Sequence, residues 1–190
     1  SEPTRVGTSI GDITAGLFTA IGINAALYDR QKTGKGMYID VSMLDCQIAI
    51  LENAIARYLA KNEIPKPMGS RHPSIAPFEA FKTKNSYIII AAGNDKLFEK
   101  LCILLKIPEV MKDSKFSDNS SRAKHIDELK TIIENRLSSK KTKEWVAEME
   151  KEKIPCGPIY NIKEAVENPQ IDSRNMIVEA YHKVIGNFKL

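Results

Sequence analysis

The chain has 190 residues, of which 43% are hydrophobic and 27% are charged, an ordinary composition for a soluble globular protein of one or two domains. Its net charge of +4 comes from 28 basic and 24 acidic residues spread along the sequence. Nucleic-acid binding calls for a clustered basic stripe with stacking aromatic residues, so we expect no nucleic-acid partner. The three cysteines are odd in number and far apart, which argues against a disulfide framework and favours a reducing cytoplasm.

The sequence also argues against a metal-binding protein and against a membrane or secreted protein. The three histidines, His72, His125 and His182, are too far apart to predict a metal site. The longest apolar stretch, residues 13–27, is broken by polar side chains and is short for a membrane span, and no basic region precedes an apolar signal core. We therefore expect a cytoplasmic protein without metal and without membrane contact.

The first predicted element is a helix from residue 9 or 10 to about residue 30. It is apolar nearly all round, as a helix buried on most sides is, and the glycines and basic residues of 32–36 are typical of a helix end. Residues 37–43 alternate apolar and polar side chains, which predicts a short strand. Residues 43–61 then carry leucine and isoleucine at helical spacing.

One carboxylate, Asp12, stands at the entrance of the first helix, and two interpretations of it are compatible. Ser9 and Asp12 have the spacing of a capping box, and the helix dipole favours an acid in the first turn. Glycines at positions 7, 11 and 16 also let a ligand or another backbone approach. Exposed in a cleft, the same carboxylate is suited to act as a nucleophile that forms a covalent acyl intermediate.

The composition changes after residue 62, where two prolines and a glycine predict a linker. We expect an α+β fold divided into a helical part (1–62), a small α+β domain with its linker (63–168) and an extended return segment (169–190). Within the second part a β-hairpin is predicted, with strands 78–82 and 87–92. The other predicted elements are a helix capped at residues 93–95 and stopped by Pro108, helices at 122–137 and 142–151, an extended segment at 154–159, a short helix from Asn161 to Asn168-Pro169, and an extended tail from 177 to 190.

Several motifs together resemble the family III CoA-transferases, also called the CaiB/BaiF family. They occur in order across nearly the whole chain: Gly11-Asp12 before a small-residue helix, Ala25-Ala26-Leu27-Tyr28-Asp29-Arg30, Lys32-Thr33-Gly34-Lys35-Gly36, Val41-Ser42-Met43-Leu44-Asp45, Arg71-His72-Pro73-Ser74-Ile75-Ala76-Pro77-Phe78, and Ile154-Pro155-Cys156-Gly157-Pro158.

The resemblance implies that Asp12 is the catalytic aspartate, which attacks an acyl-CoA thioester to give a mixed anhydride and free CoA thiolate. The thiolate returns to form an aspartyl-CoA thioester, from which a carboxylic acid takes the CoA through a second anhydride. Met43 matches a position expected beside CoA, with core packing as the other interpretation. Coenzyme A would enter as the acyl-CoA substrate.

Family members are longer and begin with a nucleotide-fold half that supplies most of the CoA pocket. The resemblance therefore implies a partial chain, inactive alone, that acts with that half or with a companion chain and forms a homodimer. The glycine-rich loop of some members is not evident, and residues 71–77 stand where a substrate-side segment is expected.

Two alternatives stay open: an α-methylacyl-CoA racemase, in which the matching aspartate works with a histidine, and an inactive folded fragment. The acyl donor and the acceptor acid are not identified.

Overall fold

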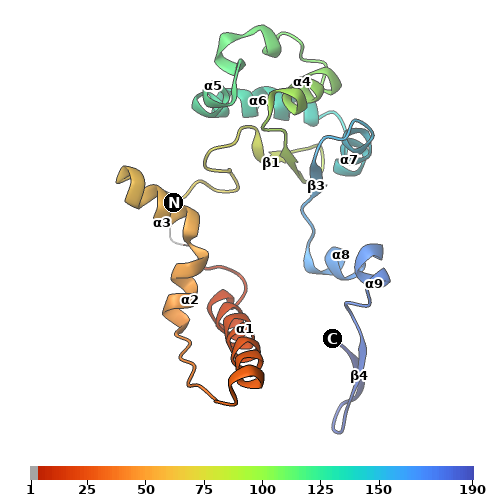
Figure 1. Cartoon of the computed structure of the whole chain (residues 1–190). Helices are drawn as coiled ribbons and strands as arrows, with labels where there is room; N and C mark the ends of the chain where they lie inside the picture. The colour runs from red at the N-terminus through yellow and green to blue at the C-terminus, as the bar shows by residue number, and fades with distance from the viewer. Residues whose placement is uncertain (1–3) are drawn as a thin grey trace. The chain divides into compact units, whose positions relative to one another are not determined.

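The computed structural model describes residues 4–190 and contains both helices and strands, which confirms the predicted mixed α+β class (Figure 1). The chain divides into two compact units, Ser1–Pro67 and Met68–Leu190. The division falls inside the stretch where the two prolines predict a linker. A further boundary at residue 168 stays a prediction.

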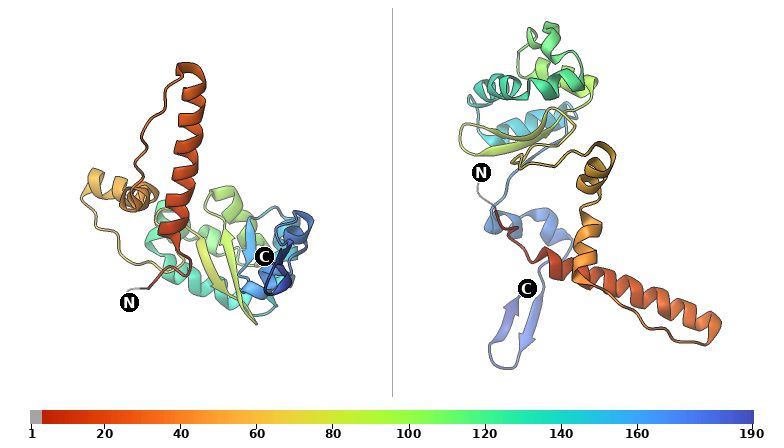
Figure 2. Two further views of the ribbon diagram at one scale, coloured as in Figure 1. Left: turned by 90° about the horizontal axis from the view of Figure 1, so that it is seen from below. Right: turned by 90° about the vertical axis from the view of Figure 1, so that its left-hand side faces the viewer.

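Unit 1 contains three helices, α1 (Ile10–Thr33), α2 (Met43–Ile50) and α3 (Glu52–Lys61), and α1 packs against α2. The long α1 helix is visible in both views of Figure 2. It ends where Gly34 adopts a φ of 69°, a left-handed conformation that glycine takes without steric cost. The Gly34 N–H donates to the Arg30 carbonyl at 2.8 Å. The predicted start and stop of this helix are confirmed.

Two predictions for unit 1 are wrong. Residues 35–42 carry no strand, because a strand needs a neighbour with which to share hydrogen bonds and the described residues of this unit provide none. The helix predicted from 43 to 61 is broken at Leu51, whose φ and ψ are −90° and 20°. The Leu51 N–H donates to the Ile48 carbonyl, three residues back, at 3.1 Å. This hydrogen bond, three residues back instead of four, ends α2 before α3 begins.

Unit 2 is built on an antiparallel sheet with the strand order β1–β2–β3. Strands β1 (Phe78–Lys82) and β2 (Tyr87–Ala91) form the predicted hairpin, with Ala80 opposite Ile89. The predicted extended segment contributes β3 (Cys156–Pro158), which pairs with the other edge of β2.

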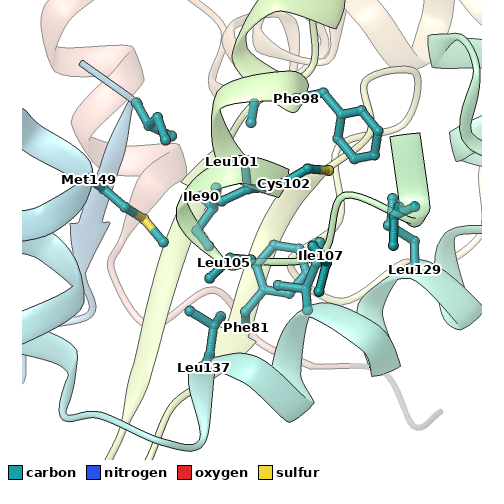
Figure 3. Packing of buried hydrophobic residues seen from close by; sticks show 14 of the residues in the cluster. Phe81, Ile90, Phe98, Leu101, Cys102, Leu105, Ile107, Leu129, Leu137 and Met149 are labelled. Carbon is teal, nitrogen blue, oxygen red and sulfur yellow. The ribbon is translucent and has the colours of Figure 1, made fainter. Parts of the chain in front are cut away.

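Helices surround this sheet. They are α4 (Asp95–Leu104), α5 (Asn119–Lys124), α6 (Ile126–Leu137) and α7 (Thr142–Lys151), with two 3-10 turns, η1 (Val110–Lys112) and η2 (Ser114–Phe116). Of these, α6 and α7 contact the strands directly. The helix predicted at 122–137 is instead two helices, because His125 leaves helical geometry at φ −109° and ψ 26°. Figure 3 shows the core, in which fully buried side chains from the strands and helices meet, among them Phe81, Ile90, Leu101, Leu129 and Met149.

The last part of the chain contains α8 (Ile162–Val166), α9 (Pro169–Ser173) and a hairpin of β4 (Glu179–His182) and β5 (Gly186–Lys189). Asn161 caps α8 as predicted. Asn168-Pro169 begins α9 directly after α8, since Pro169 occupies the first helical turn, where its missing N–H costs nothing. The extended tail is confirmed as a hairpin.

Helix α1 has 24 residues and is long and apolar enough to cross a membrane by length and composition, so the prediction that the stretch is too short is wrong. The core helix of a soluble protein passes the same test. Length and composition do not separate these two kinds of helix.

Candidate functional site

Asp12 lies in the first turn of α1 with an exposed side chain. The Ser9 side chain accepts no capping hydrogen bond there, so the predicted capping box is not formed, whereas α8 does begin with one. Within residues 4–190, the Asp12 carboxylate has no hydrogen-bond or ion-pair partner. It is thus a free acid at the end of the helix where the peptide dipoles place partial positive charge.

The glycine before this acid allows a close contact between α1 and α2. A Cβ atom at Gly11 would lie 3.3 Å from both Cδ and Nε2 of Gln47, so the Gln47 side chain lies close against the start of α1. The Gln47 amide also donates to the Met43 carbonyl at 3.4 Å. Sequence reasoning missed Gln47, although a glycine inside a helix and next to a candidate nucleophile was a signal of close approach.

Met43, the second predicted site residue, is the first residue of α2 and is 47% exposed. Within unit 1 its side chain is therefore not core. Ser42 fixes the start of this helix, because its hydroxyl oxygen accepts the Asp45 N–H at 3.3 Å. Asp12 and Met43 thus stand in the first turns of two helices that pack together.

A hollow of about 350 Å³ lies between α1 and the chain that leads into α2. Phe18 and Gly22 line it from α1, and Ile39 and Cys46 from the other side. The two sides approach closely at Gly22, where a Cβ atom would lie 3.3 Å from Ile39 Cγ2. Neither Asp12 nor Met43 lines this hollow, so the predicted residues lie in the first turns of α1 and α2 but not in the hollow.

In unit 2 the segment 71–77 is held by charged side chains. Arg71 donates to Asp127 Oδ1 at 2.6 Å, and its Nε lies 3.3 Å from Glu79 Oε1. Glu79 is buried and also pairs with Lys130. The hydrogen bond from Arg71 lowers the pKa of the Asp127 carboxyl, and the charge of Arg71 adds to the effect.

We expect this network to make unit 2 less stable in acid. A carboxyl whose pKa is lowered in the folded state contributes stability above its unfolded pKa of about 4, and this stability is lost as the pH falls through the folded pKa. Urea unfolding followed by fluorescence of the one tryptophan, the buried Trp145 of unit 2, should show a lower midpoint at about pH 3 than at about pH 6. Asp127→Asn should weaken this pH dependence, and an unchanged pH dependence in that variant would contradict the assignment.

A second anchor of the same segment is Arg122, whose side chain is fully buried. Its guanidinium lies 4.5 Å from the centre of the Phe98 ring. Its N–H groups reach four acceptors: Ala76 O at 2.8 Å, Asp95 Oδ1 at 2.9 Å, Gly93 O at 3.0 Å and Phe116 O at 3.2 Å. Arg122 therefore joins the segment to α4 and to η2.

No cluster of three or more histidine, cysteine or acidic side chains that could hold a metal ion occurs in the part of the chain that the structure describes. The two cysteines of unit 2, Cys102 and Cys156, are also unsuited to act as nucleophiles. Burial raises the pKa of the Cys102 thiol to about 12 and also raises that of Cys156, so both remain thiols, which are poor nucleophiles.

Comparison with known proteins identifies the family. The whole chain, residues 1–190, matches the family model described as CoA-transferase family III. The chain belongs to CoA-transferase family III. The resemblance inferred from the motifs is confirmed.

Curated relatives of this family III chain are named CoA-transferases. It is 40% identical to the acetyl-CoA:oxalate CoA-transferase of Acetobacter aceti, over 94% of this chain and 46% of that protein. It is 35% identical to the human succinyl-CoA:glutarate CoA-transferase, over 100% of this chain and 43% of that protein. The chain thus spans less than half the length of these relatives.

Solved structures agree with this assignment. A CaiB/BaiF family protein from Brucella suis is 39% identical with a TM-score of 0.80, over 94% of this chain and 47% of that one. A Mycobacterium tuberculosis protein has a TM-score of 0.87 at 24% identity, over 100% of this chain and 49% of that one, and shares the fold.

Proposed function

We propose that the protein transfers CoA from an acyl-CoA to a carboxylic acid with Asp12 as the covalent nucleophile. The observation that carries this proposal is the free Asp12 carboxylate, exposed and without a partner in the described residues of a family III chain. A carboxylate engaged in capping its own helix would be a weaker nucleophile, because its lone pairs would be used by backbone N–H groups. Asp12 has no such engagement.

The proposed chemistry is balanced, with one oxygen exchanged through Asp12 in each complete cycle. An oxygen of Asp12 attacks the thioester carbonyl, the C–S bond breaks, and CoA thiolate leaves a mixed anhydride. The thiolate attacks the Asp12 carbonyl carbon, forms aspartyl-CoA and releases the donor acid with one Asp12 oxygen. The acceptor carboxylate then attacks the aspartyl-CoA carbonyl and displaces the thiolate, which gives a second anhydride. The thiolate attacks the acceptor carbonyl of this anhydride, forms the new acyl-CoA and leaves one acceptor oxygen on Asp12. Such intermediates split a difficult exchange into easier steps.

The neighbours of Asp12 support this role. Gly11 and Gln47 fix the start of α1 against α2, which limits the motion of the nucleophile. We propose that Met43, half-exposed at the start of α2, contacts CoA through its thioether side chain. Apolar contacts of this kind position a substrate and leave the reacting groups free.

The substrates and partners are proposed from relatives. Two of them are named for oxalate and glutarate as acceptors, so we propose a small organic acid as the acceptor here. Because the chain spans less than half of their length, we propose that activity requires further protein, either nucleotide-fold sequence in the same chain or a companion chain. A homodimer and a cytoplasmic location remain predictions.

An oxygen-18 experiment tests the proposal. The catalytically active protein is incubated with succinyl-CoA and oxygen-18-labelled glutarate, and the Asp12 peptide is then examined by mass spectrometry. We expect glutaryl-CoA to form and one heavy oxygen to appear on Asp12. A sample without any acyl-CoA should stay unlabelled, since the acceptor then has no aspartyl-CoA to attack. CoA transfer without a label on Asp12 would refute the mechanism.

A further inference from the structure

Gln47 lies between the two helix starts that carry the predicted site residues. It follows Met43 by four residues in α2, so the two side chains share one face of that helix. On the α1 side, a Cβ atom at Gly11 would lie 3.3 Å from Cδ and Nε2 of Gln47 and 3.6 Å from its Oε1. The amide group of Gln47 therefore lies directly against the residue that precedes Asp12.

Part of this amide is unused. Its nitrogen carries two N–H bonds, and one of them is directed at the Met43 carbonyl at 3.4 Å, which is long for a hydrogen bond of this kind. Within residues 4–190 the second N–H has no acceptor, and the Gln47 side chain is exposed. Gln47 thus keeps a free neutral donor beside the start of α1.

The Asp12 carboxyl group is roughly one side-chain length from this donor, since consecutive Cα atoms are about 3.8 Å apart and Gly11 and Asp12 are neighbours in the first turn of α1. The exposed Gln47 side chain has several rotatable bonds, so its amide can turn from Gly11 to the adjoining carboxyl group. In the described residues no hydrogen bond joins Gln47 to Asp12. The donor is therefore not used by the resting carboxylate.

Two steps of the proposed cycle place negative charge on the carbonyl oxygen of Asp12. The CoA thiolate attacks the Asp12 carbonyl carbon of the first anhydride, and the acceptor carboxylate attacks the same carbon in aspartyl-CoA. In each attack the carbonyl oxygen becomes an alkoxide, and a donor aimed at it stabilises the transition state. Only an interaction that is stronger in the transition state than in the resting enzyme raises the rate. A donor that the resting carboxylate does not use meets this condition.

We propose that Gln47 is a further catalytic residue, whose Nε2 donates a hydrogen bond to the carbonyl oxygen of Asp12 when either nucleophile attacks it. In the first attack a C–S bond forms and the donor carboxylate leaves with the electron pair of the broken C–O bond. In the second a C–O bond forms and the thiolate leaves. Gln47 stays a neutral amide throughout and transfers no proton. The inference rests on the proposed function, because the oxygen that Gln47 stabilises belongs to the Asp12 intermediates.

Gln47→Met in the catalytically active protein tests this role. Methionine keeps an unbranched side chain of similar length against Gly11 but has no N–H donor. After mixing with succinyl-CoA alone, aspartyl-CoA is followed as the CoA adduct by mass spectrometry of the intact protein. We expect it to form about 100-fold more slowly than in the wild type. In steady-state transfer kcat should fall while the KM for succinyl-CoA stays unchanged, since the hydrogen bond is made only in the transition state.

Two further variants keep the test independent of folding. Gln31→Met is the matched control, because Gln31 is an exposed glutamine of α1 in the same unit, and it should form aspartyl-CoA at the wild-type rate. Gln47→Glu keeps the shape of the side chain but only accepts hydrogen bonds at neutral pH, so it should be slowed at least as much as Gln47→Met. Thermal unfolding followed by circular dichroism should be the same for all three variants.

The outcomes separate this inference from the proposed function. A wild-type rate of aspartyl-CoA formation in a folded Gln47→Met or Gln47→Glu protein overturns the role of Gln47, and so does a loss confined to the KM for succinyl-CoA. If the wild type still places oxygen-18 on Asp12 in that case, Asp12 remains the nucleophile. Absence of the label from the wild type refutes the Asp12 intermediates themselves, and the role of Gln47 falls with them.

Discussion

Replacement of Asp12 by asparagine is expected to reduce CoA transfer by at least about 10,000-fold. The amide lacks the anionic oxygen that must form the anhydride, and every transfer in the proposed cycle passes through that anhydride. Because the Asp12 side chain is exposed and makes no capping hydrogen bond, folding should change by less than about 1 kcal/mol. Steady-state transfer assays, together with urea unfolding of the same preparation, measure both quantities.

Glu52→Gln is the matched control for this variant. Glu52 is also an exposed acid in a first helical turn of unit 1, at the start of α3, so its replacement removes the same kind of dipole interaction without touching the proposed nucleophile. We expect near-normal transfer in Glu52→Gln. Near-normal transfer in Asp12→Asn would exclude Asp12 as the covalent nucleophile, whatever the control shows.

The second large effect is expected at Arg122. Arg122→Ala removes a fully buried guanidinium and leaves four acceptors without their donor, and three of these are backbone carbonyls. Each buried carbonyl left without its donor costs about 1–3 kcal/mol, so we expect a loss of at least about 3 kcal/mol, a large part of the 5–15 kcal/mol typical of a domain. Urea unfolding monitored by the fluorescence of Trp145, which is 4% exposed, reports this loss in unit 2.

Arg136→Ala provides the comparison. Arg136 is an exposed arginine in the last turn of α6, where surface substitutions change stability by about 0.5 kcal/mol or less. If Arg122→Ala were no more destabilising than Arg136→Ala, Arg122 would not be the anchor of the segment 71–77. Arg122→Lys should recover little stability, since a single ammonium group cannot reproduce the planar fork of donors.

Elements whose determinants are local were predictable from the sequence. Gly34 ends α1 because only the local backbone must turn left-handed, and the hairpin of β1 and β2 follows from two apolar runs around a polar turn. Elements that depend on a neighbour were not. The alternation at 37–43 resembles a strand, but it forms none without a partner strand. The breaks at Leu51 and His125 were missed because apolar spacing continues through both positions.

Among the residues of the candidate site, too, those with a local sequence signal were predicted and those without one were missed. Asp12 was found from an acid that follows glycine at the start of an apolar helix, and its sequence neighbours placed the chain in its family. Gln47, Arg122 and Asn119 had no such signal, because the residues that they contact lie tens of residues away. The capping box at Ser9 and Asp12 was predicted from spacing alone, and the hydroxyl oxygen of Ser9 makes no such bond.

The sequence by itself determined the family, the mixed fold class and the acid proposed to carry the chemistry, because motif order and helix-start patterns are properties of short stretches. Only the tertiary structure decided that this acid is unpartnered, that Arg71 is neutralised by Glu79 and Asp127, and that Gln47 lies against the start of α1. The physical reason is that a hydrogen bond is satisfied or left open by whichever group lies within about 3 Å in space, and folding, not sequence distance, brings those groups together.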